Sequence, residues 1–152
     1  MKKMLFSLIV AGMLFSCNQP STESIDTNAP IDLLVANWAD GWNNHDSAAV
    51  RNLFEDEALL TDDQLIATGI EEIAAKMISP NIRLVSNLKS SKLQEWTHRD
   101  MAGYTGTYRL EVLINQEVVA TPIGIFTVNW RKNKSGEWKI TTATIYSFAE
   151  QK

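Results

Sequence analysis

Two helices and the turn between them can be recognised in PIDLLVANWADGWNNHDSAAVRNLF, residues 30–54. Pro30 suits the first turn of a helix, where its missing N–H costs nothing. Apolar side chains then recur at helical spacing and predict a helix over residues 30–44. This apolar stripe consists of Ile31, Leu34, Val35, Trp38 and Trp42. Asp46 is placed to cap a second, short helix, which would bury Val50, Leu53 and Phe54.

The next segment predicts a hairpin followed by a third helix. Residues 58–61 are typical of a strand, residues 62–64 of a turn and residues 65–67 of a returning strand. Thr68-Gly-Ile-Glu71 has the form of a capping box, with Thr68 as the cap and Glu71 reaching back to it. Ser79-Pro80 predicts the end of this helix, because proline disfavours helical backbone in the residue before it.

From Asn81 onward apolar and polar residues alternate, which is the period of strands with one buried face. The expected buried faces are Ile82, Leu84 and Leu88, then Tyr104, Tyr108, Leu110, Val112 and Ile114, then Val118, Ala120, Phe126, Val128 and Trp130, and finally Trp138, Ile140 and Tyr146. Turns are expected at residues 115–116 and 132–136. The order predicts an α+β fold with three helices in the N-terminal half, packed on a curved, largely antiparallel sheet.

The N-terminal segment predicts export and lipid attachment. Lys2 and Lys3 precede an apolar run, residues 4–15, that is too short to span a bilayer as a mature helix. The run closes on Leu-Phe-Ser-Cys, residues 14–17, which resembles the lipobox of bacterial lipoproteins, whose cysteine thiol receives a diacylglycerol. Cys17 is the only cysteine in the chain, so an internal disulfide is excluded. An ordinary signal peptide with an incidental thiol is the alternative.

We therefore expect three segments: a signal peptide over residues 1–16, a flexible tether over residues 17–29 that begins with lipidated Cys17, and one domain over residues 30–152. The lipid would hold the protein on a membrane of the bacterial cell envelope, facing the periplasm or the cell surface. Removal of Lys2 and Lys3 leaves 12 basic against 18 acidic residues. Nucleic acid is therefore not an expected partner, and membrane attachment should come from acyl chains alone.

Four short motifs occur in the order found in a known superfamily. They are Gly-Trp-Asn-Asn-His-Asp (41–46), Leu-Phe-Glu-Asp-Glu-Ala (53–58), Gly-Ile-Glu-Glu-Ile (69–73) and Gly-Glu-Trp-Lys-Ile (136–140). Over residues 30–148 the chain resembles the nuclear transport factor 2-like superfamily, and within it the SnoaL-like branch. The resemblance implies a cone-shaped fold, in which a curved sheet wraps round the helices and a pocket lies at the open end. The superfamily contains ketosteroid isomerase, scytalone dehydratase, polyketide cyclases and proteins that only bind or associate, so the fold does not give the function.

Many members of this superfamily pair through the outer face of the sheet, so the resemblance makes a homodimer plausible. In this chain the predicted outer face is polar, which permits at most a modest, wet interface. Its residues are Thr105, Thr107, Arg109, Glu111, Thr127, Asn129 and Arg131.

Comparison with ketosteroid isomerase places a general base at Asp62, which lies 16 residues past Asp46. The two positions that match the isomerase's oxyanion donors are Trp38 and Gly124. An indole N–H can donate one hydrogen bond but is no phenol, and glycine has no donor side chain. Because such donors commonly supply on the order of 3–4 kcal/mol each, the changes argue against steroid isomerase activity.

If the domain has a working pocket, Asp62 should point into it and Asp63 away from it. Its walls should include Trp38, Trp42, Phe126 and Tyr146, with Tyr108 and Gly124 as further candidates. A solvated Asp-Asp turn is the alternative for Asp62 and Asp63, and ordinary core packing is the alternative for the aromatic residues. No metal site is expected from two histidines, His45 and His98, without other ligands at suitable spacing. No cofactor motif and no nucleophile signature are present.

Three functions follow as hypotheses. The first is a lipid-anchored domain that binds a small hydrophobic molecule or serves as an accessory domain, without catalysis. The second is a cofactor-free lyase or isomerase with Asp62 as general base. The third is a structural dimerisation module. The contents of the cone distinguish them. A filled cone favours a structural role, an apolar cavity with no ionisable group favours binding, and a cavity with Asp62 at its floor and a donor opposite favours catalysis.

Overall fold

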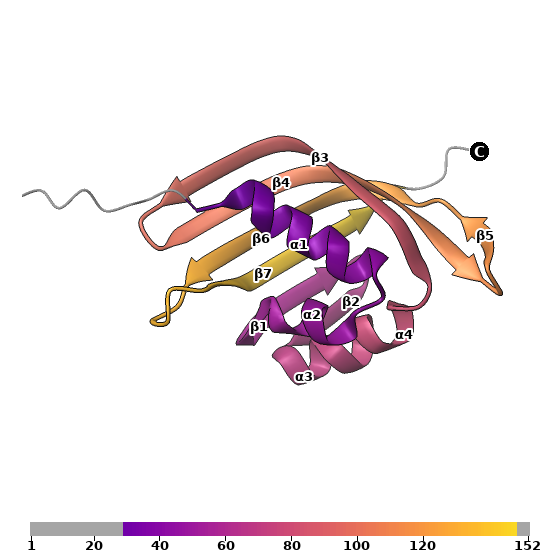
Figure 1. The fold of residues 1–152 in the computed structure, drawn as a ribbon, viewed down its shortest axis with the longest axis horizontal. Coiled ribbons are helices and arrows are strands. Elements are labelled where there is room, and N and C mark those ends of the chain that lie inside the picture. The colour runs from indigo at the N-terminus through magenta and orange to yellow at the C-terminus, as the bar shows by residue number, and fades with distance from the viewer. Residues whose placement is uncertain (1–28, 149–152) are drawn as a thin grey trace, which may run out of the picture.

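A curved seven-stranded sheet wraps around one long helix, and the other helices gather beside strands at one edge of the sheet (Figure 1). The computed structural model describes residues 29–148. The helices are α1 (Ile31–Asn43), α2 (Ser47–Asn52) and a third helical run made of α3 (Ile70–Ile73), the π-helical η1 (Ala74–Ile78) and α4 (Ser79–Asn81). The strands are β1 (Phe54–Asp62), β2 (Leu65–Thr68), β3 (Val85–His98), β4 (Met101–Ile114), β5 (Glu117–Ala120), β6 (Ile123–Lys132) and β7 (Trp138–Ser147).

The strands follow the order β2-β1-β7-β6-β4-β3, and β5 pairs with β4. This mixed architecture confirms the predicted α+β class with a curled sheet and three helical segments. One pair departs from the predicted antiparallel arrangement, because β7 enters between β6 and β1 and runs parallel to β1. The third helical run, residues 70–81, also extends past the middle of the chain rather than lying wholly in the N-terminal half.

The first two helices begin and end almost where the sequence predicts. Helix α1 buries the apolar stripe that includes Leu34, Trp38 and Trp42. The Asp46 carboxylate accepts a hydrogen bond from the Ala49 N–H at 2.9 Å, which confirms its role as the cap of α2. Phe54 is buried as predicted but belongs to β1, because α2 ends at Asn52.

The third helical run corrects two predictions. Its N-cap is Gly69, which has a φ of 80° that glycine adopts without strain. The helix therefore begins one residue later than the predicted capping box with Thr68 as the cap requires. The Thr68 N–H therefore bonds Glu72 at 3.1 Å, while Glu71 pairs with Arg51 of α2. The run also continues through Pro80 to Asn81, after the π-helical turn of η1. As a result Ile82 and Leu84 precede β3 instead of forming its first inward positions.

A bulge in β7 reverses the predicted facing of the last strand. Ile140 pairs with Trp130 and Thr142 with Asn129, so Thr141 is an extra residue in β7. An extra residue moves all later side chains to the opposite face. Ile140 is buried as predicted, but Ala143 is the next buried position, and Tyr146 turns outward with 57% of its surface exposed.

The predicted outer face of the sheet is present on β4 and β6. Thr105 and Thr127 lie side by side there, with their hydroxyl oxygens 3.0 Å apart, and Asn129 bonds Thr142 of β7 at 2.8 Å. Tyr146 extends this face with its ring packed edge-on against Phe148. The outer face is therefore less uniformly polar than the sequence indicated.

The predicted signal peptide, the lipid acceptor Cys17 and nearly all of the tether lie outside the described residues. Ala29, which the sequence assigned to the tether, packs against the core at the start of the domain. None of the helices between residues 29 and 148 has the length and apolar character needed to cross a membrane.

Candidate functional site

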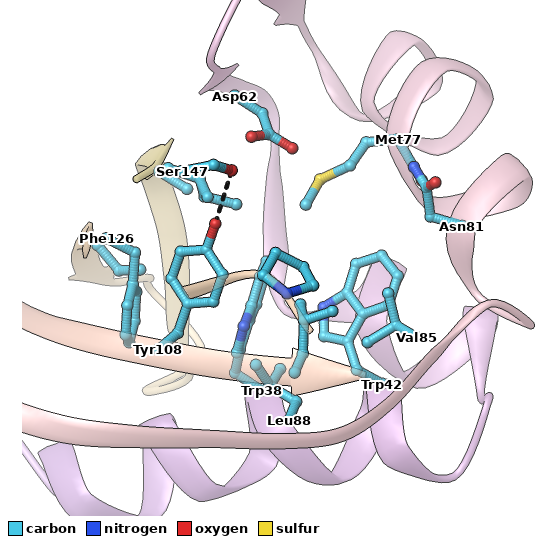
Figure 2. A pocket seen from close by; sticks show the side chains of 15 residues that line it. Trp38, Trp42, Asp62, Met77, Asn81, Val85, Leu88, Tyr108, Phe126 and Ser147 are labelled. Atoms are coloured by element: carbon cyan, nitrogen blue, oxygen red, sulfur yellow. Dashed lines mark hydrogen bonds between the residues drawn. The ribbon is translucent and has the colours of Figure 1, made fainter. Parts of the chain in front are cut away.

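A cavity of about 190 Å³ lies between the second half of α1 and the inner face of the sheet. The ends of three strands surround it, because β1 and β7 end beside the cavity and β3 begins there. Most of its lining is apolar (Figure 2). Its lining includes the side chains of Trp38, Trp42, Asp62, Tyr108, Phe126 and Ser147.

Asp62 is the last residue of β1, and its carboxylate is directed toward the cavity (Figure 2). Burial raises the pKa of this carboxyl above its ordinary value of 3.8, and the negative charge of neighbouring Asp63 raises it further. A raised pKa makes the ionised carboxylate a stronger proton acceptor.

Asp63 turns away from the cavity and has a structural role. Its φ of 49° is in the left-handed region, where aspartate is tolerated. Its Oδ1 accepts a hydrogen bond from the Ser147 N–H at 3.0 Å, and its own N–H donates to the Ile145 carbonyl at 3.2 Å. These bonds hold the end of β7 against β1 and so fix Ser147 beside Asp62.

Trp38 and Trp42 both belong to the core and both line the cavity. Their rings meet edge to face with centroids 5.9 Å apart, and Trp38 meets Phe54 in the same way at 5.8 Å. Trp42 is only 3% exposed, and its Nε1–H is buried without a hydrogen-bond acceptor among the described residues. The sequence comparison drew attention to the indole of Trp38, whereas the unpaired donor is one helical turn further along.

Tyr108, a further candidate for the cavity wall, brings a hydroxyl group to the cavity, whereas Tyr146 does not line it. The Tyr108 and Ser147 hydroxyl oxygens are 2.9 Å apart, on the side of the cavity that faces Asp62 (Figure 2). Burial raises the pKa of the Tyr108 phenol, and the nearby Asp62 charge raises it further. The phenol thus keeps its proton and can donate a hydrogen bond. Ser147 was not identified from the sequence, because the predicted facing of β7 pointed it outward.

Two predicted pocket residues do not line the cavity. Tyr146 lies on the outer face, because the bulge at Thr141 moves the later side chains of β7 to the opposite face. Gly124 does not leave room for a ligand, because a Cβ built on it would lie 2.6 Å from the Tyr108 ring and 2.1 Å from the Tyr146 carbonyl oxygen. The space at Gly124 is therefore occupied by the protein itself. Phe126, two residues on, does line the cavity.

The turn after α1 also shapes the cavity, which the sequence did not reveal. The Asn43 side chain bonds the backbone of Leu88, and His45 Nε2 lies 3.0 Å from the carbonyl oxygen of Val85. Both contacts fix the start of β3, from which Val85 and Leu88 form one wall of the cavity. His45 therefore has a structural role in this turn.

The electrostatics of the cavity are dominated by one acidic group. Among the described residues that line it, Asp62 is the only one with an ionisable carboxyl, and none is a lysine, arginine or histidine. Over residues 29–148 no group of three or more His, Cys, Asp or Glu lies close enough together to hold a metal ion. The arrangement can accept a proton or a hydrogen bond at Asp62 and donate one from Tyr108.

Solved structures with the same fold come from several bacteria. A ketosteroid isomerase-like protein from Erwinia carotovora atroseptica superposes with a TM-score of 0.67 at 16% identity, covering 84% of this chain and 98% of that one. A nuclear transport factor 2-like superfamily protein from Salmonella enterica gives 0.67 at 12% identity, covering 80% and 91%. A protein with a cystatin-like fold from Novosphingobium aromaticivorans, described as NTF2-like, gives 0.63 at 12% identity, covering 80% and 81%.

No family model and no curated protein matches the sequence. At such low identities the structural likeness establishes the fold and leaves the activity open. This chain has the fold shared by nuclear transport factor 2-like and ketosteroid isomerase-like proteins.

Proposed function

We propose that the domain binds a small, largely apolar molecule in the cavity beneath Asp62. The observation that carries this proposal is an apolar cavity of about 190 Å³ with a single half-buried carboxyl group at its edge. A purely structural module would be expected to fill this space with side chains, because protein interiors are close-packed. The open space therefore supports binding over a structural role.

The volume limits the size of the ligand. An apolar cavity of about 150 Å³ accommodates one benzene molecule, so 190 Å³ suits a compound slightly larger than a single ring. Sites for drug-sized ligands commonly have about 300–1,000 Å³. The four fused rings of a steroid would not be enclosed, which agrees with the loss of both isomerase donor positions at Trp38 and Gly124.

A second candidate function is proton transfer with Asp62 as general base. The specific observation in its favour is that Asp62 has a raised pKa and faces the Tyr108–Ser147 hydroxyl pair. A base needs a pKa near the working pH, and a donor opposite it can stabilise developing negative charge. This cofactor-free lyase or isomerase reaction would act on a small substrate with an acidic C–H bond.

Native mass spectrometry of the protein purified under mild conditions tests the binding proposal. We expect a co-purifying small molecule, or capture of single-ring compounds, in the wild-type protein. Ala143→Leu is the matched variant, because Ala143 lines the cavity and the added carbon atoms would occupy part of the space that a ligand needs. Retained ligand in a folded Ala143→Leu variant would show that the cavity is not the binding site.

Asp62→Asn separates binding from catalysis. The amide keeps the shape of the carboxyl but cannot act as a base at neutral pH. Asp63→Asn is the control, because Asp63 lies outside the cavity and the amide retains the Oδ1 that accepts from the Ser147 N–H. Turnover that is lost only in Asp62→Asn supports proton transfer, and binding without turnover in every variant leaves the binding function alone.

We further propose that a lipid on Cys17 holds the domain at the bacterial cell envelope. In support, Leu-Phe-Ser-Cys follows an apolar run with a basic head. The domain begins beside the end of β3, where Ala29 and Thr97 border one groove, whereas the cavity lies at the opposite ends of the strands. The chain would then join the domain at the end that is remote from the cavity. Cell fractionation of Cys17→Ser tests the anchor, and a variant that stays fully membrane-bound would contradict it.

A further inference from the structure

Trp42 carries a buried donor that the folded chain leaves unpaired. The residue is 3% exposed, its indole lines the cavity, and its Nε1–H has no acceptor among the described residues. Buried polar groups in native proteins nearly always have hydrogen-bond partners, and an unpaired one costs free energy. An apolar side chain without a donor at this position would avoid that cost, so the unpaired N–H calls for an explanation.

The position of Trp42 relates the donor to the cavity. Figure 2 shows its indole on the far side of the open space from the Asp62 carboxylate, between the wall from β3 and the centre of the site. The ring is held in place by its edge-to-face contact with Trp38. The Nε1 atom itself has no appreciable accessible surface, so the donor lies behind the wall of the open space.

We propose that the cavity selects small neutral carbonyl compounds, whose oxygen accepts a hydrogen bond from Trp42 Nε1–H. This proposal rests on the binding function proposed above and narrows its ligand class. The nitrogen is enclosed by neighbouring side chains in the empty cavity, so the carbonyl oxygen reaches it by displacing part of the apolar wall. The ligand then satisfies a donor that the protein alone leaves unpaired.

The remaining lining residues agree with a neutral carbonyl compound. The walls are apolar and suit the hydrocarbon part of such a ligand. Asp62 disfavours a carboxylate or phosphate ligand, because no cationic side chain among the described lining residues would balance the two negative charges. A pure hydrocarbon would fit the volume but would leave the Trp42 donor as unpaired as it is in the empty protein, so it would gain no hydrogen bond.

The test compares two ligands of nearly equal shape, acetophenone and ethylbenzene, which differ in one carbonyl oxygen. We expect the wild-type protein to bind acetophenone at least about tenfold more tightly, equivalent to about 1.4 kcal/mol. Trp42→Phe should lose this preference and bind both compounds alike, because it removes the donor. Trp96→Phe is the control and should keep the preference, because Trp96 is partly exposed and does not line the cavity. Calorimetric titration of each folded variant gives the affinities.

A second readout does not depend on a variant that folds. In ¹⁵N-labelled wild-type protein the Trp42 indole N–H resonance should move downfield on addition of acetophenone and stay in place with ethylbenzene. Equal affinity for the two compounds, or a Trp42 resonance that acetophenone does not move, would overturn the carbonyl proposal while leaving the binding function intact. Failure of both compounds to bind would overturn the carbonyl proposal and contradict the proposed binding function for ligands of this size.

Discussion

The side chain of Asn43 pairs with the backbone of Leu88 as one strand pairs with another. Its Oδ1 accepts from the Leu88 N–H at 2.7 Å and its Nδ2 donates to the Leu88 carbonyl at 3.1 Å. The two residues are 45 positions apart in the sequence. This contact joins the end of α1 to β3 and thereby fixes two walls of the cavity relative to each other.

Replacement of Asn43 tests this contact directly. Asn43→Ala removes two partly buried hydrogen bonds, each worth about 0.5–1.5 kcal/mol, so we expect the free energy of unfolding to fall by about 1–3 kcal/mol. Asn44→Ala, at the exposed next position, should change it by less than about 0.5 kcal/mol. Urea unfolding of both variants measures the difference. Equal effects would mean that the pairing with Leu88 adds no stability.

The raised pKa of Asp62 predicts a pH-dependent cost in stability. Because the folded state holds this proton to higher pH than the unfolded state, stability falls as pH rises from 3.8 through the raised pKa. Asp62→Asn removes the charged form, so the variant should be more stable than wild type at pH 7, with the gain shrinking as the pH falls toward 3.8.

Thermal unfolding between pH 4 and pH 7 measures this difference. Asp100→Asn is the control, because this exposed aspartate lies in the turn between β3 and β4 and does not line the cavity. A gain for Asp62→Asn that is constant over the pH range would show that desolvation of the carboxylate is not its cause.

The Tyr108 hydroxyl should contribute measurably to stability. Tyr108→Phe removes the hydrogen bond with Ser147, and we expect a loss of about 0.5–1.5 kcal/mol in the free energy of unfolding. Tyr146→Phe makes the same chemical change on a residue that is 57% exposed and should have an effect close to zero. Denaturant unfolding midpoints compare the two. A reversed order would place the buried hydroxyl at Tyr146.

Gly124 should tolerate no side chain. In Gly124→Ala the new methyl group would lie 2.1 Å from the Tyr146 carbonyl oxygen, and the backbone cannot move away without disturbing the β6–β7 pairing. Overpacking of this kind typically costs about 1–3 kcal/mol. Gly136→Asn, in a loop with nothing within 4 Å of the added Cβ, should cost about 1 kcal/mol or less. Unfolding curves that place Gly124→Ala at or above wild type would show that a ligand-sized space exists there after all.

The lone carboxyl group of the cavity should exclude anions. Benzenesulfonate stays charged at all accessible pH values, so its binding should weaken at least about tenfold as Asp62 ionises with rising pH, a change of about 1.4 kcal/mol. In Asp62→Asn this pH dependence should disappear, because no charge remains to repel the ligand. Fluorescence titration across the pKa of Asp62 checks both. Tight binding of the anion at pH 7 would require a cationic group in the site.

Local patterns in the sequence were sufficient for the elements that depend on neighbouring residues. The spacing of Leu34, Trp38 and Trp42 predicted α1 and its buried face, because a helix repeats every 3.6 residues. The Asp46 cap, the hairpin that brings Asp62 to the end of β1, and the inward set of β6 with Phe126 followed from similarly short-range chemistry. The overall order of these elements was also enough to predict the fold class.

Contacts between distant residues decided the site. The extra residue at Thr141 turned Ser147 inward and Tyr146 outward, because a bulge depends on the fit of β7 between two other strands and leaves no mark in the alternation of side chains. Tyr108 filled the space beside Gly124, Asn43 fixed β3 from 45 residues away, and the Trp42 donor stayed unpaired because of what packs around it. Each outcome depends on three-dimensional neighbours that a linear pattern does not specify. The sequence therefore predicted that Asp62 and the aromatic side chains of Trp38, Trp42, Tyr108 and Phe126 face a cavity, but not that Ser147 does.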